Sequence, residues 1–145
     1  MLAIFVLASC QETFLDRTQI STDKYAGVMQ ELLLNKKAID SIYMDSTKKV
    51  YDLVIIDSVK NSSKGILPKT FELFKNKEIY MIKISSGCIF FVLKIHDENM
   101  GATYECLRRV DQGQCNFVGS NNSDIKYIEK LDKEWEYLRI SIYSE

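Results

Sequence analysis

The chain has 145 residues, of which 46% are hydrophobic and 27% are charged, with a single Pro. This length fits one domain with its own core, and this composition excludes collagen-like, Pro-rich, low-complexity and intrinsically disordered chains. Nineteen basic and 20 acidic residues give a net charge of −1, so no overall positive field points to nucleic acid as a partner.

The chain opens with an apolar run, Leu2 to Ala8, which is followed by Ser9 and Cys10. This run is too short to cross a bilayer, which takes about 20 helical residues, but it is typical of a secretory signal that ends in small residues. The sequence Leu7-Ala8-Ser9-Cys10 resembles the lipobox of bacterial lipoproteins, over the first ten residues only. In that family a peptidase cuts before the cysteine, which then carries acyl chains.

The resemblance implies that residues 1–9 are a signal peptide and that Cys10 carries the lipid of a cell-envelope protein. Because no basic residue precedes Arg17, we expect the signal to start upstream of Met1 or the sequence to be trimmed. Gln11 stands where an Asp would retain an enteric lipoprotein at the inner membrane, so the outer membrane is favoured. The polar residues 10–21 are predicted to be a lipidated tether. The alternative is a buried strand over 2–8 with Cys10 as a core thiol.

With Cys10 lipidated, three further cysteines lie in an oxidising compartment. Cys106 and Cys115 flank Asp111-Gln112-Gly113, and a hairpin centred on this turn would place the two sulfurs opposite each other. They are therefore the predicted disulfide pair, with reduced and buried thiols as the alternative. The absence of a C-x-x-C pair and the single His in the sequence argue against a metal site, and we expect no cofactor.

Two helices are predicted in the first half of the chain. Residues 22–37 carry one apolar stripe at helical spacing, made of Tyr25, Val28, Met29, Leu32 and Leu33. Pro68 begins a second, shorter helix. The residues between them, 38–67, are ambiguous, and over Val50–Asp57 we favour a helix over a strand.

From Glu78 onwards the hydrophobic period becomes two, which predicts strands. They cover Ile79–Ile84, Cys88–Ile95, Thr103–Arg108, a short Asn116–Val118 and Glu134–Tyr143. We expect a turn at His96–Gly101 and a surface loop at Gly119–Ser123. The predicted fold of residues 22–145 is a single α+β domain, with N-terminal helices packed on one face of a C-terminal antiparallel β-meander of four to five strands.

Few residues carry chemistry. His96, the single His, precedes Asp97 and Glu98 and is a weak candidate for a general base, although polar residues are expected in a turn. Trp135, Tyr137 and Arg139 alternate along the last strand and would form a partner surface if that face points outward. We favour the alternative, in which these aromatic residues pack under the helices.

The sequence therefore predicts a small lipid-anchored envelope lipoprotein that is not an enzyme and that binds a protein partner. By analogy with its class it would be an immunity protein, an inhibitor or an assembly factor. Two alternatives stay open. One is a lipoprotein that binds a small ligand between sheet and helices, and the other is a small envelope hydrolase that uses His96.

Overall fold

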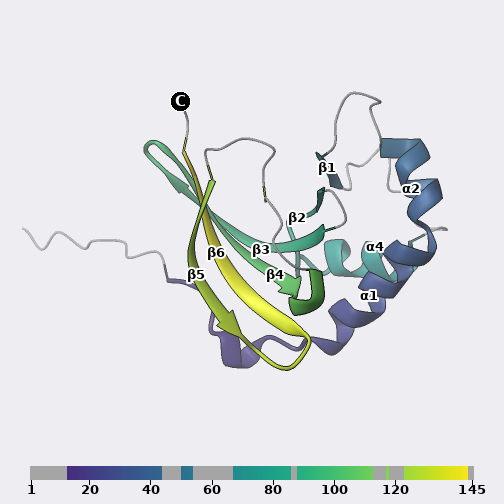
Figure 1. Ribbon diagram of the computed structural model, residues 1–145, viewed down its shortest axis with the longest axis horizontal. Helices are drawn as coiled ribbons and strands as arrows, with labels where there is room; N and C mark the ends of the chain where they lie inside the picture. Colours follow the sequence, from purple (N-terminus) through teal and green to yellow (C-terminus); the bar gives the residue numbers. More distant parts are fainter. Residues whose placement is uncertain are drawn as a thin grey trace, which may run out of the picture.

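The computed structural model describes residues 13–43, 50–53, 67–85, 88–112, 117 and 123–143. These residues form helices and one antiparallel sheet, which confirms the predicted α+β class (Figure 1). The helical elements are η1 (Arg17–Gln19), α1 (Asp23–Leu34), α2 (Lys36–Tyr43), α4 (Pro68–Lys75) and η2 (Val110–Gln112). The strands are β1 (Val50–Leu53), β2 (Met81–Ser85), β3 (Cys88–Glu98), β4 (Gly101–Arg109), β5 (Ser123–Lys130) and β6 (Trp135–Tyr143).

Helix α1 carries most of the predicted apolar stripe. Its buried apolar side chains are spaced by one, three or four residues, on a single face of the helix: Tyr25, Val28, Met29 and Leu32. Leu33, which the stripe included, is 57% exposed. The helix predicted over 22–37 is confirmed for Asp23–Leu34, but it ends at Leu34, where the Asn35 side-chain amide also donates to the Glu31 carbonyl oxygen. A second helix, α2, then begins at Lys36.

The Glu31 side chain fixes the start of α4. Its carboxylate accepts hydrogen bonds from the N–H groups of Lys69 and Thr70 at 2.9 and 2.7 Å and from the Thr70 hydroxyl at 2.7 Å. The first N–H groups of a helix have no partner within the helix and carry partial positive charge. Glu31 is therefore a capping group that joins α1 to α4. These hydrogen bonds explain why a carboxylate that is only 8% exposed is tolerated here.

The helix favoured over Val50–Asp57 is wrong for its first part. Val50–Leu53 is a strand that pairs antiparallel with β2, with Tyr51 opposite Ile84. The β-branched and aromatic side chains at its start suit a strand, and the pairing with β2 decides the conformation that local propensity left open. The remainder of that prediction, from residue 54 to residue 57, lies outside the described residues.

The sheet has six described strands, in the order β1-β2-β3-β4-β6-β5, and is thus larger than the predicted four to five. Strand β5 was not predicted, because its residues Ser123–Lys130 are mostly exposed on an edge strand that pairs with β6 alone. Its position outside β6 also means that the last two strands depart from a simple meander. Of the strand predicted at Asn116–Val118, only Phe117 is described, and it is not in a strand.

Strand β3 is longer than predicted and includes His96, Asp97 and Glu98, which were expected in a turn. It pairs with β4 as far as Glu98 opposite Gly101, with a register shift between Val92 and Lys94. Gly101 has φ near 153°, and a Cβ there would overlap the Ile142 carbonyl oxygen on β6. The close approach of that neighbouring strand therefore requires glycine at the hairpin.

The two faces of the sheet carry separate cores. One cluster combines α1 and α4 with alternate residues of the sheet, including Phe91, Leu107, Trp135 and Tyr137. The other lies on the opposite face and contains Phe90, Cys106, Phe117, Leu138 and Ile140. The predicted alternation along β6 is thus confirmed. We call the face with Phe91, Glu105 and Tyr137 the inner face.

The segment before α1 is part of the fold. Residues Thr13–Ile20, hereafter the N-terminal segment, run along the β5–β6 side of the sheet before the chain enters α1 (Figure 1). Leu15 and Ile20 pack against the inner-face cluster. The prediction of a free tether over residues 10–21 is therefore wrong from Thr13 onwards, because Phe14, Leu15 and Ile20 supply apolar contacts that a solvated linker lacks.

Candidate functional site

The polar centre of the inner face is a buried pair made by neighbouring strands. His96 on β3 lies opposite Thr103, and Glu105 on β4 is two residues further along and so points to the same face. His96 Nε2 lies 2.6 Å from Glu105 Oε2. The two residues are 3% and 0% exposed, so the pair is shut away from solvent.

Glu105 has two further donors, and they come from different parts of the chain. The Tyr137 hydroxyl, on β6, donates to Glu105 Oε1, and the Leu15 backbone N–H donates to the same oxygen at 2.8 Å. Arg139 Nε in turn donates to the Tyr137 hydroxyl oxygen at 3.2 Å. A buried carboxylate needs such partners, since burial without them is costly. Three strands and the N-terminal segment therefore converge on one side chain.

Hydrogen bonding sets the charge of this centre. Burial acts to raise the pKa of the Glu105 carboxyl, but the hydrogen bonds from Tyr137, His96 and the Leu15 N–H outweigh it and leave that pKa below its usual value. Burial, together with the bond to Glu105, raises the pKa of Tyr137. At neutral pH the site therefore holds a Glu105 carboxylate and a neutral Tyr137 phenol that donates to it.

The N-terminal segment covers the His96–Glu105 pair. The Phe14 ring meets His96 edge to face, with 4.9 Å between ring centroids, and the Arg139 guanidinium carbon lies 3.8 Å from the centroid of the Phe14 ring. Lys94 Nζ donates to the Thr13 carbonyl oxygen at 2.8 Å. Aromatic and cation–π contacts of this kind contribute about 0.5–1.5 kcal/mol each. Phe14 thus forms the lid of the His96–Glu105 pair.

Arg17 ties the segment to the edge strand β5. Its guanidinium forms an ion pair with Glu129 and lies 5.4 Å from the ring centroid of Tyr127. The Tyr127 hydroxyl donates to Glu129 at 2.6 Å, and this bond, with help from the Arg17 charge, outweighs desolvation and lowers the pKa of Glu129. Arg139 also lies over Tyr127, at 4.6 Å from the ring centroid. Both arginines therefore lie over the Tyr127 ring, and Arg17 also pairs with a carboxylate.

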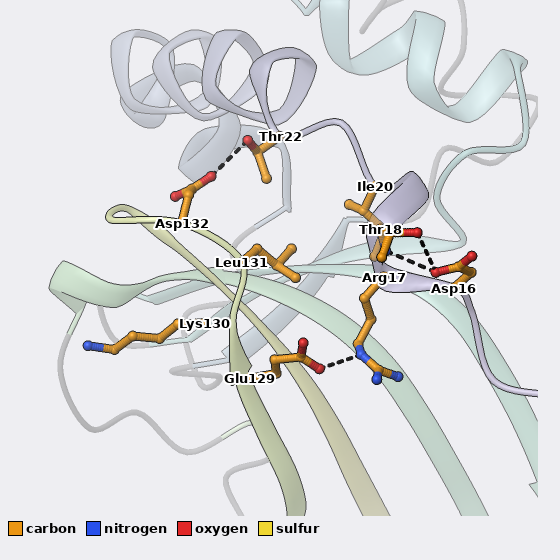
Figure 2. A pocket seen from close by; sticks show the side chains of 9 residues that line it. All are labelled: Asp16, Arg17, Thr18, Ile20, Thr22, Glu129, Lys130, Leu131 and Asp132. Carbon is orange, nitrogen blue, oxygen red and sulfur yellow. Dashed lines mark hydrogen bonds and ion pairs between the residues drawn. The ribbon is translucent and has the colours of Figure 1, made fainter.

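A pocket of about 340 Å³ lies beside the Arg17–Glu129 ion pair, between the N-terminal segment and the turn from β5 to β6 (Figure 2). Its lining residues are Asp16, Arg17, Thr18, Ile20, Thr22, Glu129, Lys130, Leu131 and Asp132. Figure 2 shows Arg17 directed at Glu129 and Lys130 extending away from that pair. At one end the Thr22 hydroxyl donates to Asp132 at 3.0 Å. Neither His96 nor Glu105 lines this pocket.

The structure places the predicted site residues differently from the sequence analysis. His96 pairs with Glu105, whereas Glu98 accepts a hydrogen bond from Thr103. Trp135 and Tyr137 share one face as expected, but they are 2% and 0% exposed. The outward partner surface of Trp135, Tyr137 and Arg139 is therefore wrong, because Trp135 and Tyr137 are buried in the inner-face cluster and Arg139 lies over Phe14 and Tyr137.

The cysteines also depart from the predicted pairing. Cys106 is a free thiol that is fully buried in the cluster on the face opposite the inner face. Burial raises its pKa, so the thiol is protonated. The predicted bond between Cys106 and Cys115 is therefore wrong. Cys88, in contrast, is disulfide-bonded. The positions of Cys10 and Cys115 lie outside the described residues.

Sequence reasoning missed the residues that complete the site. Glu105 lies within the predicted strand Thr103–Arg108, where it shares a face with Leu107, and a carboxylate beside an apolar side chain is a signal of polar burial. Phe14 and Leu15 were hidden within a stretch that is polar on average. Two adjacent apolar side chains there are the signal that could have shown a packed segment.

Among the described residues, no three His, Cys, Asp or Glu side chains gather closely enough to hold a metal ion. In the same part of the chain, no helix combines the length and apolar character needed to cross a membrane. Comparison with known proteins finds no similar family model, no similar curated protein and no similar solved structure.

Proposed function

We propose that this chain is a small lipid-anchored lipoprotein of the bacterial cell envelope that binds a protein partner and is not an enzyme. The observation that supports a non-catalytic role is the burial of the His96–Glu105 pair, which would have to supply any acid–base chemistry. His96 and Glu105 are 3% and 0% exposed and lie beneath the N-terminal segment. A general base must come within hydrogen-bonding reach of a substrate proton, and while the N-terminal segment is in place this arrangement offers no such approach.

The position of the N-terminal segment suits an anchor at Cys10. The first described residue, Thr13, already contacts Lys94, and only two residues separate it from Cys10. Three residue steps span at most about 11 Å. Acyl chains on Cys10 would thus hold the body close to the bilayer, durably so with two or more chains. Gln11 after the cysteine favours the outer membrane.

The proposal also takes the N-terminal helices as the cover of one sheet face. Tyr25 of α1 supports this, because its ring lies 5.4 Å from Phe91 and 6.3 Å from Trp135 between centroids. The helix-covered part would then be the rigid body, and partner binding would fall to the part of the sheet beyond the helices.

Metabolic labelling with an alkyne fatty acid tests the anchor, with the protein produced from its own gene in its native cells. Wild type should be labelled and should sediment with membranes, whereas Cys10→Ser should be unlabelled and remain in the precursor form. Cys106→Ala is the matched control and should behave as wild type, since Cys106 is buried. Equal labelling of Cys10→Ser and wild type would refute the lipoprotein assignment.

A lipoprotein that binds a small ligand is the second candidate, and the pocket of about 340 Å³ beside Arg17 favours it. A hydrolase is the third, favoured by the 2.6 Å contact between His96 and Glu105. His96→Ala separates the hydrolase from the other two. Loss of a hydrolytic activity in this variant would overturn the non-enzymatic proposal, whereas a chain without such activity in either form supports it.

A further inference from the structure

The N-terminal segment is peripheral, whereas the residues that it covers are not. None of residues 13–22 is buried, and Phe14 is 43% exposed. Beneath them, Glu105 and Tyr137 are 0% exposed and His96 is 3% exposed. Segments with few buried side chains belong to the least stable part of a fold and open without global unfolding. The closed site is therefore covered by one of the more easily displaced parts of the chain.

The contacts of the segment are those of a bound peptide. One main-chain carbonyl, of Thr13, is held by Lys94 at 2.8 Å, and one main-chain N–H, of Leu15, is held by Glu105 at 2.8 Å. Main-chain hydrogen bonds give a peptide affinity, and side-chain pockets give it specificity. Here both carbonyl and N–H meet charged side chains that lie on adjacent strands.

The side chains of the segment meet complementary groups. The Phe14 ring lies against His96 and under Arg139, and the Arg17 guanidinium pairs with Glu129. Arg17 also lies 5.8 Å from the ring centroid of Tyr137, within cation–π distance. Glu105 thus accepts from the Leu15 N–H, Glu129 pairs with the Arg17 guanidinium, and the Arg139 guanidinium stacks on the Phe14 ring.

We infer that this part of the inner face is a binding groove for an extended peptide of a partner protein, and that the chain's own N-terminal segment occupies it in cis. The pattern that the groove recognises is an aromatic residue, then an aliphatic residue with a free main-chain N–H, then an arginine two positions later. In this chain the pattern is Phe14-Leu15-Asp16-Arg17. The inference rests on the proposed role as a binding protein and names the kind of partner.

Occupation in cis sets the affinity for a partner. A tethered segment competes at an effective concentration in the millimolar range for short linkers. The observed affinity for an outside peptide then falls by the fraction of molecules whose groove is open. Loosening the segment should restore that affinity without changing the groove, which consists of Lys94, His96, Glu105, Glu129 and Arg139.

The test uses the full chain and a fluorescent peptide with the sequence of residues 13–20. Phe14→Ala combined with Arg17→Ala loosens the segment in cis, and this double variant should bind the peptide roughly tenfold or more tightly than wild type does. A peptide in which the same Phe and Arg are replaced by Ala is the matched control and should not bind. Adding Glu105→Gln to the double variant should abolish binding of the unmodified peptide.

A second measurement needs no variant. In wild type with saturating peptide, the Leu15 amide should lose its protection from hydrogen exchange, because the peptide takes its place on Glu105. Equal binding of the peptide to wild type and double variant, binding of the control peptide, or binding to neither form with Leu15 still protected would each overturn the inference. Labelling at Cys10 is measured separately, so these results leave the anchor untouched.

Discussion

Two halves of the inner face are built and covered in opposite ways. In the half that Tyr25 of α1 contacts, hereafter the helix-covered half, the Tyr25 ring lies against Phe91 and Trp135, and burial raises the pKa of Tyr25 to about 12. In the polar half, His96 and Glu105 lie under a segment of which no residue is buried. Apolar area removed from water stabilises the first half, whereas a few directed hydrogen bonds close the second.

The two halves therefore contribute differently to the free energy of folding and to the closing of the site. Burial of a large apolar side chain contributes about 1.5–3 kcal/mol, so the helix-covered half dominates the free energy of folding. Fixing each residue of the N-terminal segment costs about 1–2 kcal/mol of backbone entropy, which offsets much of what its contacts provide. The polar half should therefore open alone, while the helix-covered half opens only when the whole fold does.

The largest effect is expected from a cavity in the helix-covered half. Phe91→Ala removes a fully buried ring that contacts both Tyr25 and Trp135, and it should lower the free energy of unfolding by about 3–5 kcal/mol. Urea unfolding followed by circular dichroism measures this. Leu34→Ala is the matched control at a position that is 78% exposed, with an expected change within about 0.5 kcal/mol. Similar losses in both variants would contradict the assigned core.

A smaller loss is expected in the polar half. Glu105→Gln keeps the shape of the side chain but removes the charge that accepts from Tyr137 and the Leu15 N–H. The free energy of unfolding at neutral pH should fall by about 1–3 kcal/mol. The same urea titration detects it, and a loss as large as that of Phe91→Ala would mean that the two halves do not differ in kind.

Acid should weaken the polar half selectively. The pKa of Glu105 is lower in the folded protein than its ordinary value of 4.5. Its contribution is therefore complete above the ordinary pKa and is lost as pH falls through the lower folded pKa. Unfolding midpoints measured from pH 5 downwards should decline less steeply for Glu105→Gln than for wild type. Glu134→Gln, at an exposed position, should follow the wild-type curve, and parallel curves for all three proteins would argue against an ionised Glu105.

The smallest effect on global stability belongs to the lid. Phe14→Ala should lower the free energy of unfolding by only about 1–2 kcal/mol, because the 43% exposed ring loses little more than its contacts to His96 and Arg139. It should nevertheless open the site, since loss of the contacts to His96 and Arg139 corresponds to about 1–2 kcal/mol, or about 5- to 30-fold in the open population. His96 is the single His, so its rate of modification by diethyl pyrocarbonate reports this opening directly. An unchanged rate would show that Phe14 is not the lid.

The sequence predicted the parts of the fold that are buried by regular alternation. Strand β6 was found from its alternating residues, and α4 from Pro68 at its start. Strand β5 was missed because an edge strand with mostly exposed residues lacks that pattern. The break at Asn35 coincides with a hydrogen bond from its side-chain amide to the Glu31 carbonyl oxygen, which apolar periodicity does not register.

The candidate site was harder to predict because its residues meet only through tertiary structure. His96 and Glu105 are nine positions apart, and their contact depends on the β3–β4 register with its shift between Val92 and Lys94. The contact between Leu15 and Glu105 joins residues 90 positions apart. A single sequence singles out His96, but it does not show that Glu105 pairs with it or that an N-terminal segment lies over the pair.

Native-state hydrogen exchange at the Leu15 amide, compared with the amides of β4, tests most directly whether the polar half closes independently. We expect the Leu15 amide to exchange through a local opening, with a lower free energy that changes little with low urea, while β4 exchanges only through global unfolding. If the Leu15 amide instead shares the free energy and the urea dependence of β4, the segment is an inseparable part of the core and the groove beneath it does not open.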